Sequence, residues 1–179
     1  MELGDLEFAP ALAASGLVAA PVHRALGDLE PGAVLASAID PELADTAAFC
    51  EHYKIAPEQG ANCVIVQAQR GERTWLAAAL VLGSDRLDVN SAVRKALGAK
   101  KVSFAPMDLA VELTGMEYGG ITPIGLPESW PLLVDSAAAA AGHLVIGSGI
   151  RGSKILTSGA VLASLPGAEV LPLAKVQEN

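Results

Sequence analysis

A glycine- and proline-rich stretch places the strongest limit on how this chain can fold. Residues 112–127 read ELTGMEYGGITPIGLP and hold four of the 18 glycines and two of the 11 prolines. Proline fixes φ and donates no backbone hydrogen bond, so Pro123 and Pro127 exclude a helix interior or a central strand here. Gly119 and Gly120 lack a Cβ and let another group approach bare backbone. We therefore predict a stiff, irregular loop that either connects two strands or binds a ligand.

Composition indicates one folded domain. The chain has 179 residues, of which 51% are hydrophobic and 18% charged, so it can bury a sizeable core. No apolar run reaches the roughly 18 residues that a membrane span needs, and the acidic N-terminus is unlike a signal peptide. Cys50 and Cys63 are interpreted as reduced thiols. We therefore expect a cytoplasmic protein with no membrane partner.

The negative charge is concentrated in the first third of the chain. Residues 1–60 hold ten acids against Arg24 and Lys54, a balance of −8, whereas residues 61–179 hold ten acids and ten bases. An acidic total argues against binding to duplex DNA, which depends on neutralising phosphates. The neutral part of the chain can still carry a local basic rim.

Hydrophobic spacing predicts short strands and helices in an irregular order. Expected strands are 34–39, 62–69, 74–82, 101–105, 132–134, 143–146 and 155–157, and expected helices are 22–29, 46–53, 86–97, 106–113 and 158–165. The segments 62–69 and 74–82 flank the turn Arg70–Arg73 and predict a β-hairpin. Because strands and helices do not alternate regularly, the order indicates an α+β domain with a mixed sheet.

The loop at 112–127 also carries a family resemblance. Leu113-Thr114-Gly115 followed by Gly119-Gly120-Ile121-Thr122-Pro123 resembles the Gly-x-x-x-Pro loop of the YbaK/ProRS-associated (YbaK/EbsC) family. These editing domains hydrolyse mischarged aminoacyl-tRNA, either as free-standing proteins or inserted in prolyl-tRNA synthetase. The resemblance runs from about residue 41 to 171 of a single domain 1–179, with 1–40 as a family-variable segment. It implies that the mixed sheet closes into a barrel-like core surrounded by short helices.

A second glycine-rich segment, GSGIRG at 147–152, matches the pattern G-x-G-x-x-G. Only 27 residues follow it, too few for the strands that a dinucleotide-binding unit needs, and Ser153-Lys154 breaks the order of a phosphate-binding P-loop. What remains is a glycine turn with two cations, suited to a phosphate or carboxylate, or else a solvated hairpin turn. The resemblance implies that this segment holds the terminal adenosine of tRNA. The substrate-binding residues so assigned are Thr46, Ser148, Gly149, Arg151, Gly152 and Lys154.

The resemblance implies ester hydrolysis without a metal or other cofactor. The three histidines match no metal-binding spacing, neither cysteine lies in C-x-x-C, and no G-x-S-x-G nucleophile motif is present. Backbone amides at Gly119 and Gly120, before Thr122 and Pro123, would polarise the ester carbonyl. Asp135 would line the pocket, although an N-cap of the segment 136–141 explains it equally well.

Asn62 departs from the family pattern. Editing domains of this type usually carry a lysine, followed by threonine or serine, where this chain has Asn62. Asparagine can hold a carbonyl or hydroxyl but brings no charge. Two functions stay open: a free-standing aminoacyl-tRNA deacylase, or a non-catalytic module that binds a tRNA end, a nucleotide or a protein. The resemblance implies the acceptor end of aminoacyl-tRNA as partner, with proline tRNA and prolyl-tRNA synthetase as the named candidates.

Overall fold

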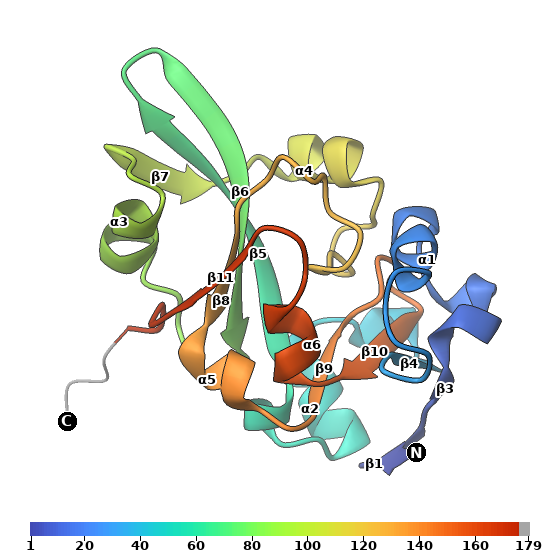
Figure 1. Cartoon of the computed structure of the whole chain (residues 1–179). Helices are drawn as coiled ribbons and strands as arrows, with labels where there is room; N and C mark the ends of the chain where they lie inside the picture. Colours follow the sequence, from blue (N-terminus) through green and yellow to red (C-terminus); the bar gives the residue numbers. More distant parts are fainter. Residues whose placement is uncertain (176–179) are drawn as a thin grey trace.

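Two main β-sheets, a two-stranded ladder of β1 and β2, and short helices around them form the molecule (Figure 1). The computed structural model describes residues 1–175. The strands are β1 (Glu2–Leu3), β2 (Leu6–Glu7), β3 (Ala9–Pro10), β4 (Leu35–Ala38), β5 (Ala61–Arg70), β6 (Arg73–Leu82), β7 (Lys101–Phe104), β8 (Leu132–Asp135), β9 (Leu144–Gly147), β10 (Ser153–Thr157) and β11 (Ala168–Leu171). The α-helices are α1 (Ala20–Leu26), α2 (Thr46–Tyr53), α3 (Arg94–Ala96), α4 (Met107–Thr114), α5 (Ser136–Ala140) and α6 (Gly159–Ala163).

The larger sheet is built on the predicted hairpin. Its order is β11-β8-β6-β5-β7, and β5 pairs antiparallel with β6 from Ala61↔Leu82 to Arg70↔Arg73. Gly71 forms the turn with a φ of +63°, a conformation that glycine adopts without strain. β8 runs parallel to both β6 and β11. The mixed sheet predicted from the sequence is therefore confirmed.

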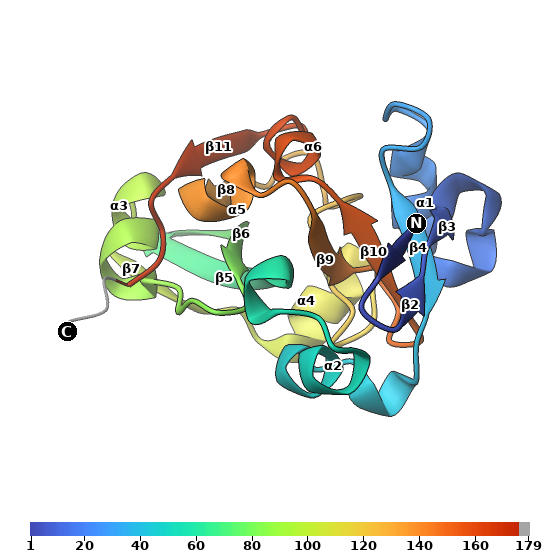
Figure 2. The same ribbon diagram turned by 90° about the horizontal axis from the view of Figure 1, so that it is seen from below.

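The smaller sheet has the order β3-β4-β10-β9 and meets the larger one at the start of β5. A single bridge, Gly60↔Val145, joins the two sheets. The expectation of a barrel was wrong, because residues 1–175 form no closed barrel. β9 is the last strand of its sheet, and its free edge forms only the isolated bridge to Gly60 before β5, so no continuous ladder within the described residues closes the two sheets into a barrel. Figure 2 shows the two sheets next to each other, with α2 and α4 on one side of the molecule.

Apolar side chains form three clusters. The main one fills the space between the sheets and includes residues of α1, α5 and α6, and a second lies between the larger sheet and α3. A third surrounds Phe49 of α2 and Phe8. Within residues 1–175, no helix has the length and apolar character needed to cross a membrane.

The helix that positions the site was predicted closely. α2 begins at Thr46 after Asp45 in the N-cap position, and it ends at Tyr53, followed by the C-cap residue Lys54, whose φ of 55° is left-handed. A π-helical turn, Val89–Val93, leads into α3 where the sequence predicted one helix over 86–97. β11 was not predicted, because its four residues AEVL lie at an exposed sheet edge and show no buried alternation.

Candidate functional site

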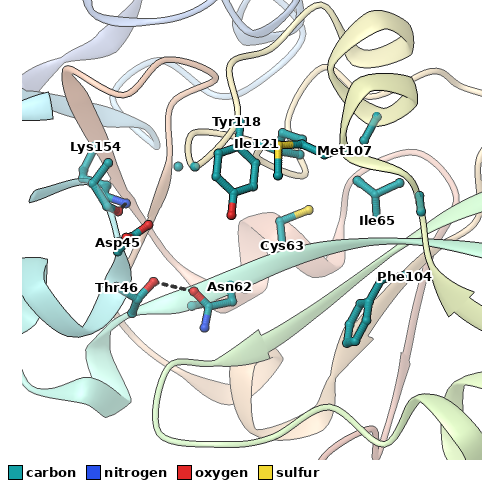
Figure 3. Close-up of a pocket in the computed structure, with 16 residues that line it drawn as sticks. Asp45, Thr46, Asn62, Cys63, Ile65, Phe104, Met107, Tyr118, Ile121 and Lys154 are labelled. Atoms are coloured by element: carbon teal, nitrogen blue, oxygen red, sulfur yellow. Dashed lines mark hydrogen bonds between the residues drawn. The ribbon is translucent and has the colours of Figure 1, made fainter. Parts of the chain in front are cut away.

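A cavity of about 530 Å³ opens where both sheets, α2 and α4 meet (Figure 3). Its walls come from the start of α2, the first half of β5, the β7–α4 connection, the loop after α4, and β10. The lining residues are Ala44, Asp45, Thr46, Ala61, Asn62, Cys63, Ile65, Phe104, Ala105, Met107, Ala110, Tyr118, Gly119, Ile121, Gly147 and Lys154. Of the predicted site residues, the structure brings Thr46, Asn62, Gly119 and Lys154 together here.

The two glycine-rich segments pack directly on each other. The Gly149 N–H donates to the Gly120 carbonyl at 2.7 Å, and the Glu117 N–H donates to the Gly149 carbonyl at 2.8 Å. A Cβ on Gly120 would lie 2.7 Å from the Ile150 carbonyl carbon and oxygen, closer than atoms can approach without a shift. The glycines of both motifs are therefore explained by close contact between two loops.

This packing changes the role expected of Gly120. Its N–H donates to the Glu117 carbonyl at 3.0 Å and its carbonyl accepts from Gly149, so both of its backbone groups are already bonded within the protein. Gly119, with a φ of +79°, does line the cavity. Of the two glycines, only Gly119 can present backbone to a ligand in the cavity.

Arg151 holds the loops in place. Its backbone N–H donates to Glu117 Oε2 at 2.7 Å, and its guanidinium donates to the carbonyls of Tyr118 at 3.3 Å and Pro41 at 3.0 Å. The side chain thus ties the loop after α4 to the segment before α2. It does not line the cavity in which it was expected to meet phosphate.

Lys154 is the cation of the cavity. It lies on β10 with 6% of its surface exposed, and its Nζ donates to the Ala44 carbonyl at 2.7 Å. The ammonium also lies 5.2 Å from the centre of the Phe49 ring. No carboxylate of residues 1–175 lies within 4.0 Å of it. Burial lowers the pKa of Lys154 to about 8, because a low-polarity surrounding disfavours the charged form.

An ammonium carries three N–H donors, and the described residues accept one of those of Lys154. A buried charge is costly unless it is paired and hydrogen-bonded. Lys154 is therefore suited to an oxygen atom of a ligand that enters the cavity.

Thr46 and Asn62 form a polar pair beside Lys154. The Thr46 hydroxyl donates to Asn62 Oδ1, as the dashed line in Figure 3 shows. This bond leaves the Asn62 amide N–H groups as donors. Asp45 makes no side-chain capping bond to α2, so the first N–H groups of this eight-residue helix keep their positive potential at the cavity wall.

The opposite wall is apolar. Ile65 and Cys63 face the cavity from β5, and Ala110 and Met107 border it from α4. Burial raises the pKa of the Cys63 thiol, which keeps it protonated at neutral pH and argues against a cysteine nucleophile.

Sequence reasoning did not assign Tyr118 to the site. Its ring points from the loop after α4 into the cavity, with the hydroxyl toward the Thr46–Asn62 pair (Figure 3), and 54% of its surface is exposed. Its position directly before the two glycines of the motif was the available signal, because a large side chain on an irregular loop is free to project.

Asp135 lies away from the cavity, where it holds the backbone of the C-terminal segment. It is 3% exposed, and its Oδ1 accepts from the N–H groups of Leu173 at 2.7 Å and Ala174 at 3.1 Å. Its Oδ2 accepts from the Ala137 N–H at 3.0 Å, the N-cap bond of α5. The geometry matches the N-cap interpretation of Asp135 rather than a place in the pocket.

The other assigned residues also lie outside the cavity lining. Ser148 is buried, and its hydroxyl lies 2.7 Å from the Ser153 hydroxyl. Thr122 is fully buried next to buried Pro123, and its hydroxyl has no hydrogen-bond partner within the described part of the chain. Gly149 and Gly152 belong to the loop that packs against Gly120 and the segment before α2. No group of three or more histidine, cysteine, aspartate or glutamate side chains gathers among residues 1–175.

Comparison with known proteins identifies the class to which this fold and cavity belong. The model of the aminoacyl-tRNA editing domain matches residues 40–165. The chain belongs to this family, which confirms the resemblance drawn from the loop motif. Family membership implies aminoacyl-tRNA as the class of partner.

Solved structures show the same fold at low sequence identity. A candidate trans-editing enzyme for prolyl-tRNA synthetase is 20% identical, with a TM-score of 0.74 over 87% of this chain and 96% of its own. A scaffold protein used for computational epitope grafting is also 20% identical, with a TM-score of 0.75 over 88% of this chain and 97% of its own. A hypothetical protein is 24% identical, with a TM-score of 0.66 over 74% of this chain and 85% of its own.

Proposed function

We propose that this protein is a free-standing, cytoplasmic deacylase that hydrolyses the ester bond of mischarged aminoacyl-tRNA. The observation that carries the proposal is the cavity, in which a buried ammonium lies across from an apolar wall. An aminoacyl ester needs both, because its carbonyl gains negative charge during hydrolysis while its side chain must leave water.

Lys154 supplies the positive charge in this mechanism. A water molecule attacks the ester carbonyl carbon, and the carbonyl oxygen becomes an oxyanion as the tetrahedral intermediate forms. The Lys154 ammonium, held at the Ala44 carbonyl, donates a hydrogen bond to that oxygen. A donor fixed in a water-poor cavity stabilises developing charge strongly, with the loss of one donor costing about 3–4 kcal/mol in known hydrolases.

Thr46 and Asn62 position the substrate. The Asn62 amide N–H groups can donate to the ester or to a ribose oxygen, since Oδ1 already accepts from the Thr46 hydroxyl. When the intermediate collapses, the bond from carbonyl carbon to ribose oxygen breaks. The ribose oxygen takes the proton that the attacking water gives up and leaves as a hydroxyl, and the free amino acid departs with the oxygen of that water. Editing domains of this family usually carry a lysine where this chain has Asn62. In this scheme Lys154 of β10 provides the positive charge instead.

The apolar wall selects the acyl group. Ala61, Cys63 and Ala110 are small, and among residues 1–175 the charged residues that line the cavity are Asp45 and Lys154. We infer that a small, uncharged amino acid such as alanine or cysteine is removed from proline tRNA, with Tyr118 covering the bound ester from the loop side.

The test is single-turnover hydrolysis of a panel of mischarged tRNAs, beginning with alanyl- and cysteinyl-tRNA that carry the proline anticodon. The reaction is run with and without EDTA. We expect a small-acyl tRNA to be hydrolysed above the uncatalysed rate and EDTA to leave that rate unchanged. Absence of turnover on every tRNA tested would refute the deacylase and leave a binding module.

A further inference from the structure

A cluster of cations stands apart from the acidic remainder of the protein. Between Arg70 and Lys101 the chain holds seven arginine or lysine residues and three acids, a balance of +4. Since the whole chain carries −8, the remaining residues carry −12. Seven of the 12 arginine and lysine residues therefore lie in one short segment of an acidic chain.

The fold brings six of these cations together on one projection, the basic lobe. Its residues are Arg70, Arg73, Arg94, Lys95, Lys100 and Lys101. The lobe is formed by the tip of the β5–β6 hairpin, α3 and β7, which lie together at the upper left of Figure 1. Arg70 pairs across the hairpin with Arg73 and donates to the Gly98 carbonyl at 3.1 Å, and the Lys100 N–H donates to the Gln69 carbonyl at 2.9 Å.

The cations of the basic lobe are available to a partner. All are exposed except Arg94, which is half-buried. In the described part of the chain, no carboxylate forms an ion pair with any of them; Lys54–Asp5, elsewhere in the molecule, is the pair that forms. Two acids lie nearby: Glu72 in the hairpin turn, and Glu169, which shares a surface hollow with Arg70 and Arg73. The lobe keeps a net positive charge with both counted.

β7 connects the basic lobe to the cavity. Lys101 at the start of this strand belongs to the lobe, and Phe104 at its end borders the cavity with 67% of its surface exposed. At about 3.3 Å per residue, the two ends of the strand are roughly 10 Å apart. β5 makes a similar connection, since Asn62 lies at the cavity and Arg70, eight residues on, lies in the lobe, roughly 26 Å away by the same rise.

We propose that the basic lobe binds the phosphate backbone of the double-stranded RNA stem whose 3′ end enters the cavity. This inference rests on the proposed function and adds the surface that recognises the rest of the substrate. Phosphates follow one another every few ångströms along each strand of a duplex, so a separation of roughly 26 Å corresponds to several base pairs. The acidic remainder repels the duplex elsewhere and orients it on the lobe.

The experiment measures binding of an unacylated RNA hairpin with a single-stranded 3′ overhang, by fluorescence anisotropy from 50 to 200 mM salt. The double substitution Lys100→Glu and Lys101→Glu reverses two exposed charges. We expect at least ten-fold weaker binding and a shallower salt dependence, because about two fewer counterions are released. The control is Arg24→Glu, an exposed cation of α1 outside the lobe, which should bind the hairpin like the wild type.

A second measurement separates this inference from the proposed function. Hydrolysis of an aminoacylated trinucleotide, which has no stem, should be the same in the double variant and the wild type, whereas hydrolysis of the full aminoacyl-tRNA should fall. Unchanged hairpin binding in the double variant, or an equal loss of binding in Arg24→Glu, would refute the proposal that the basic lobe binds the RNA stem. If the double variant binds the hairpin more weakly but the wild type hydrolyses no ester, the result would support RNA binding by the basic lobe and refute the proposed deacylase function.

Discussion

Replacement of Lys154 by methionine should remove the activity of this protein while costing it little or no stability at neutral pH. Burial lowers the pKa of Lys154 from 10.5 to about 8. One pKa unit corresponds to about 1.36 kcal/mol, so the folded state disfavours the ammonium by about 3 kcal/mol at pH values below 8. Methionine has a similar length and carries no charge to bury.

The gain is reduced by interactions that the ammonium makes. The hydrogen bond to the Ala44 carbonyl is lost, which leaves a buried acceptor unpaired at a cost of about 1–3 kcal/mol. The contact with the Phe49 ring contributes about 0.5–1 kcal/mol more. The expected net result is a free energy of unfolding at pH 7 within about 1.5 kcal/mol of the wild-type value.

The pH dependence identifies the cause. Because the folded pKa of Lys154 lies below the unfolded one, the unfolded chain binds more protons between pH 8 and 10.5. Wild-type stability must therefore rise with pH across this range relative to Lys154→Met, and the variant should be the less stable of the two proteins at the high end of the range. Lys101→Met, at an exposed lysine, should track the wild type throughout.

The assay is urea denaturation of the three proteins at intervals from pH 6.5 to 10.5. The reasoning is wrong if Lys154→Met is less stable than the wild type by the same amount at every pH. That result would show that the Lys154 ammonium already makes all its hydrogen bonds in the free protein and has no N–H donor left for a ligand.

Three further predictions concern residues around the cavity. Asn62→Ala should lower single-turnover hydrolysis by roughly ten-fold or less, the value of about one neutral hydrogen bond; a complete loss would give Asn62 a larger role. Gly120→Ala should lower the free energy of unfolding by about 1–3 kcal/mol, because the added Cβ meets the Ile150 backbone; an unchanged urea midpoint would contradict the loop packing. Asp135→Ala should cost about 2–3 kcal/mol of stability through unpaired backbone donors and leave the rate constant of hydrolysis unchanged in the folded protein; a selective fall in rate would return Asp135 to the site.

The local structure was largely predictable from the sequence. The β5–β6 hairpin follows from two apolar runs, the first of them β-branched, around a glycine turn, and α2 follows from Asp45 before a run of helix-forming residues. Both depend on neighbours within the same segment. The barrel was inferred from resemblance alone, and the single bridge at Gly60↔Val145 shows that closure depends on long-range pairing that no local pattern encodes.

The site was predicted in part, for the same reason. Gly120 and Gly149 were each interpreted as ligand-binding backbone, although they bond to each other across 29 positions of sequence. Lys154 was expected to bind the terminal adenosine of tRNA next to a glycine turn. In the structure it is buried and lines the same cavity as Asn62. The sequence around Asp135 fitted both a pocket residue and a helix N-cap. The hydrogen bond from the Leu173 N–H to its carboxylate, formed by a distant part of the chain, distinguishes the two.

The most direct test of the account is the single-turnover hydrolysis rate of the aminoacyl-tRNA that the wild type cleaves best, measured for Lys154→Met and for Arg24→Met at saturating protein. Arg24 is an exposed cation outside both the cavity and the basic lobe. The account predicts at least a ten-fold fall for Lys154→Met, since a hydrogen bond from a charged group contributes about 1.5–3 kcal/mol, and a wild-type rate for Arg24→Met. A folded Lys154→Met protein that hydrolyses the ester at the wild-type rate would contradict the assignment of this cavity and its buried cation to catalysis.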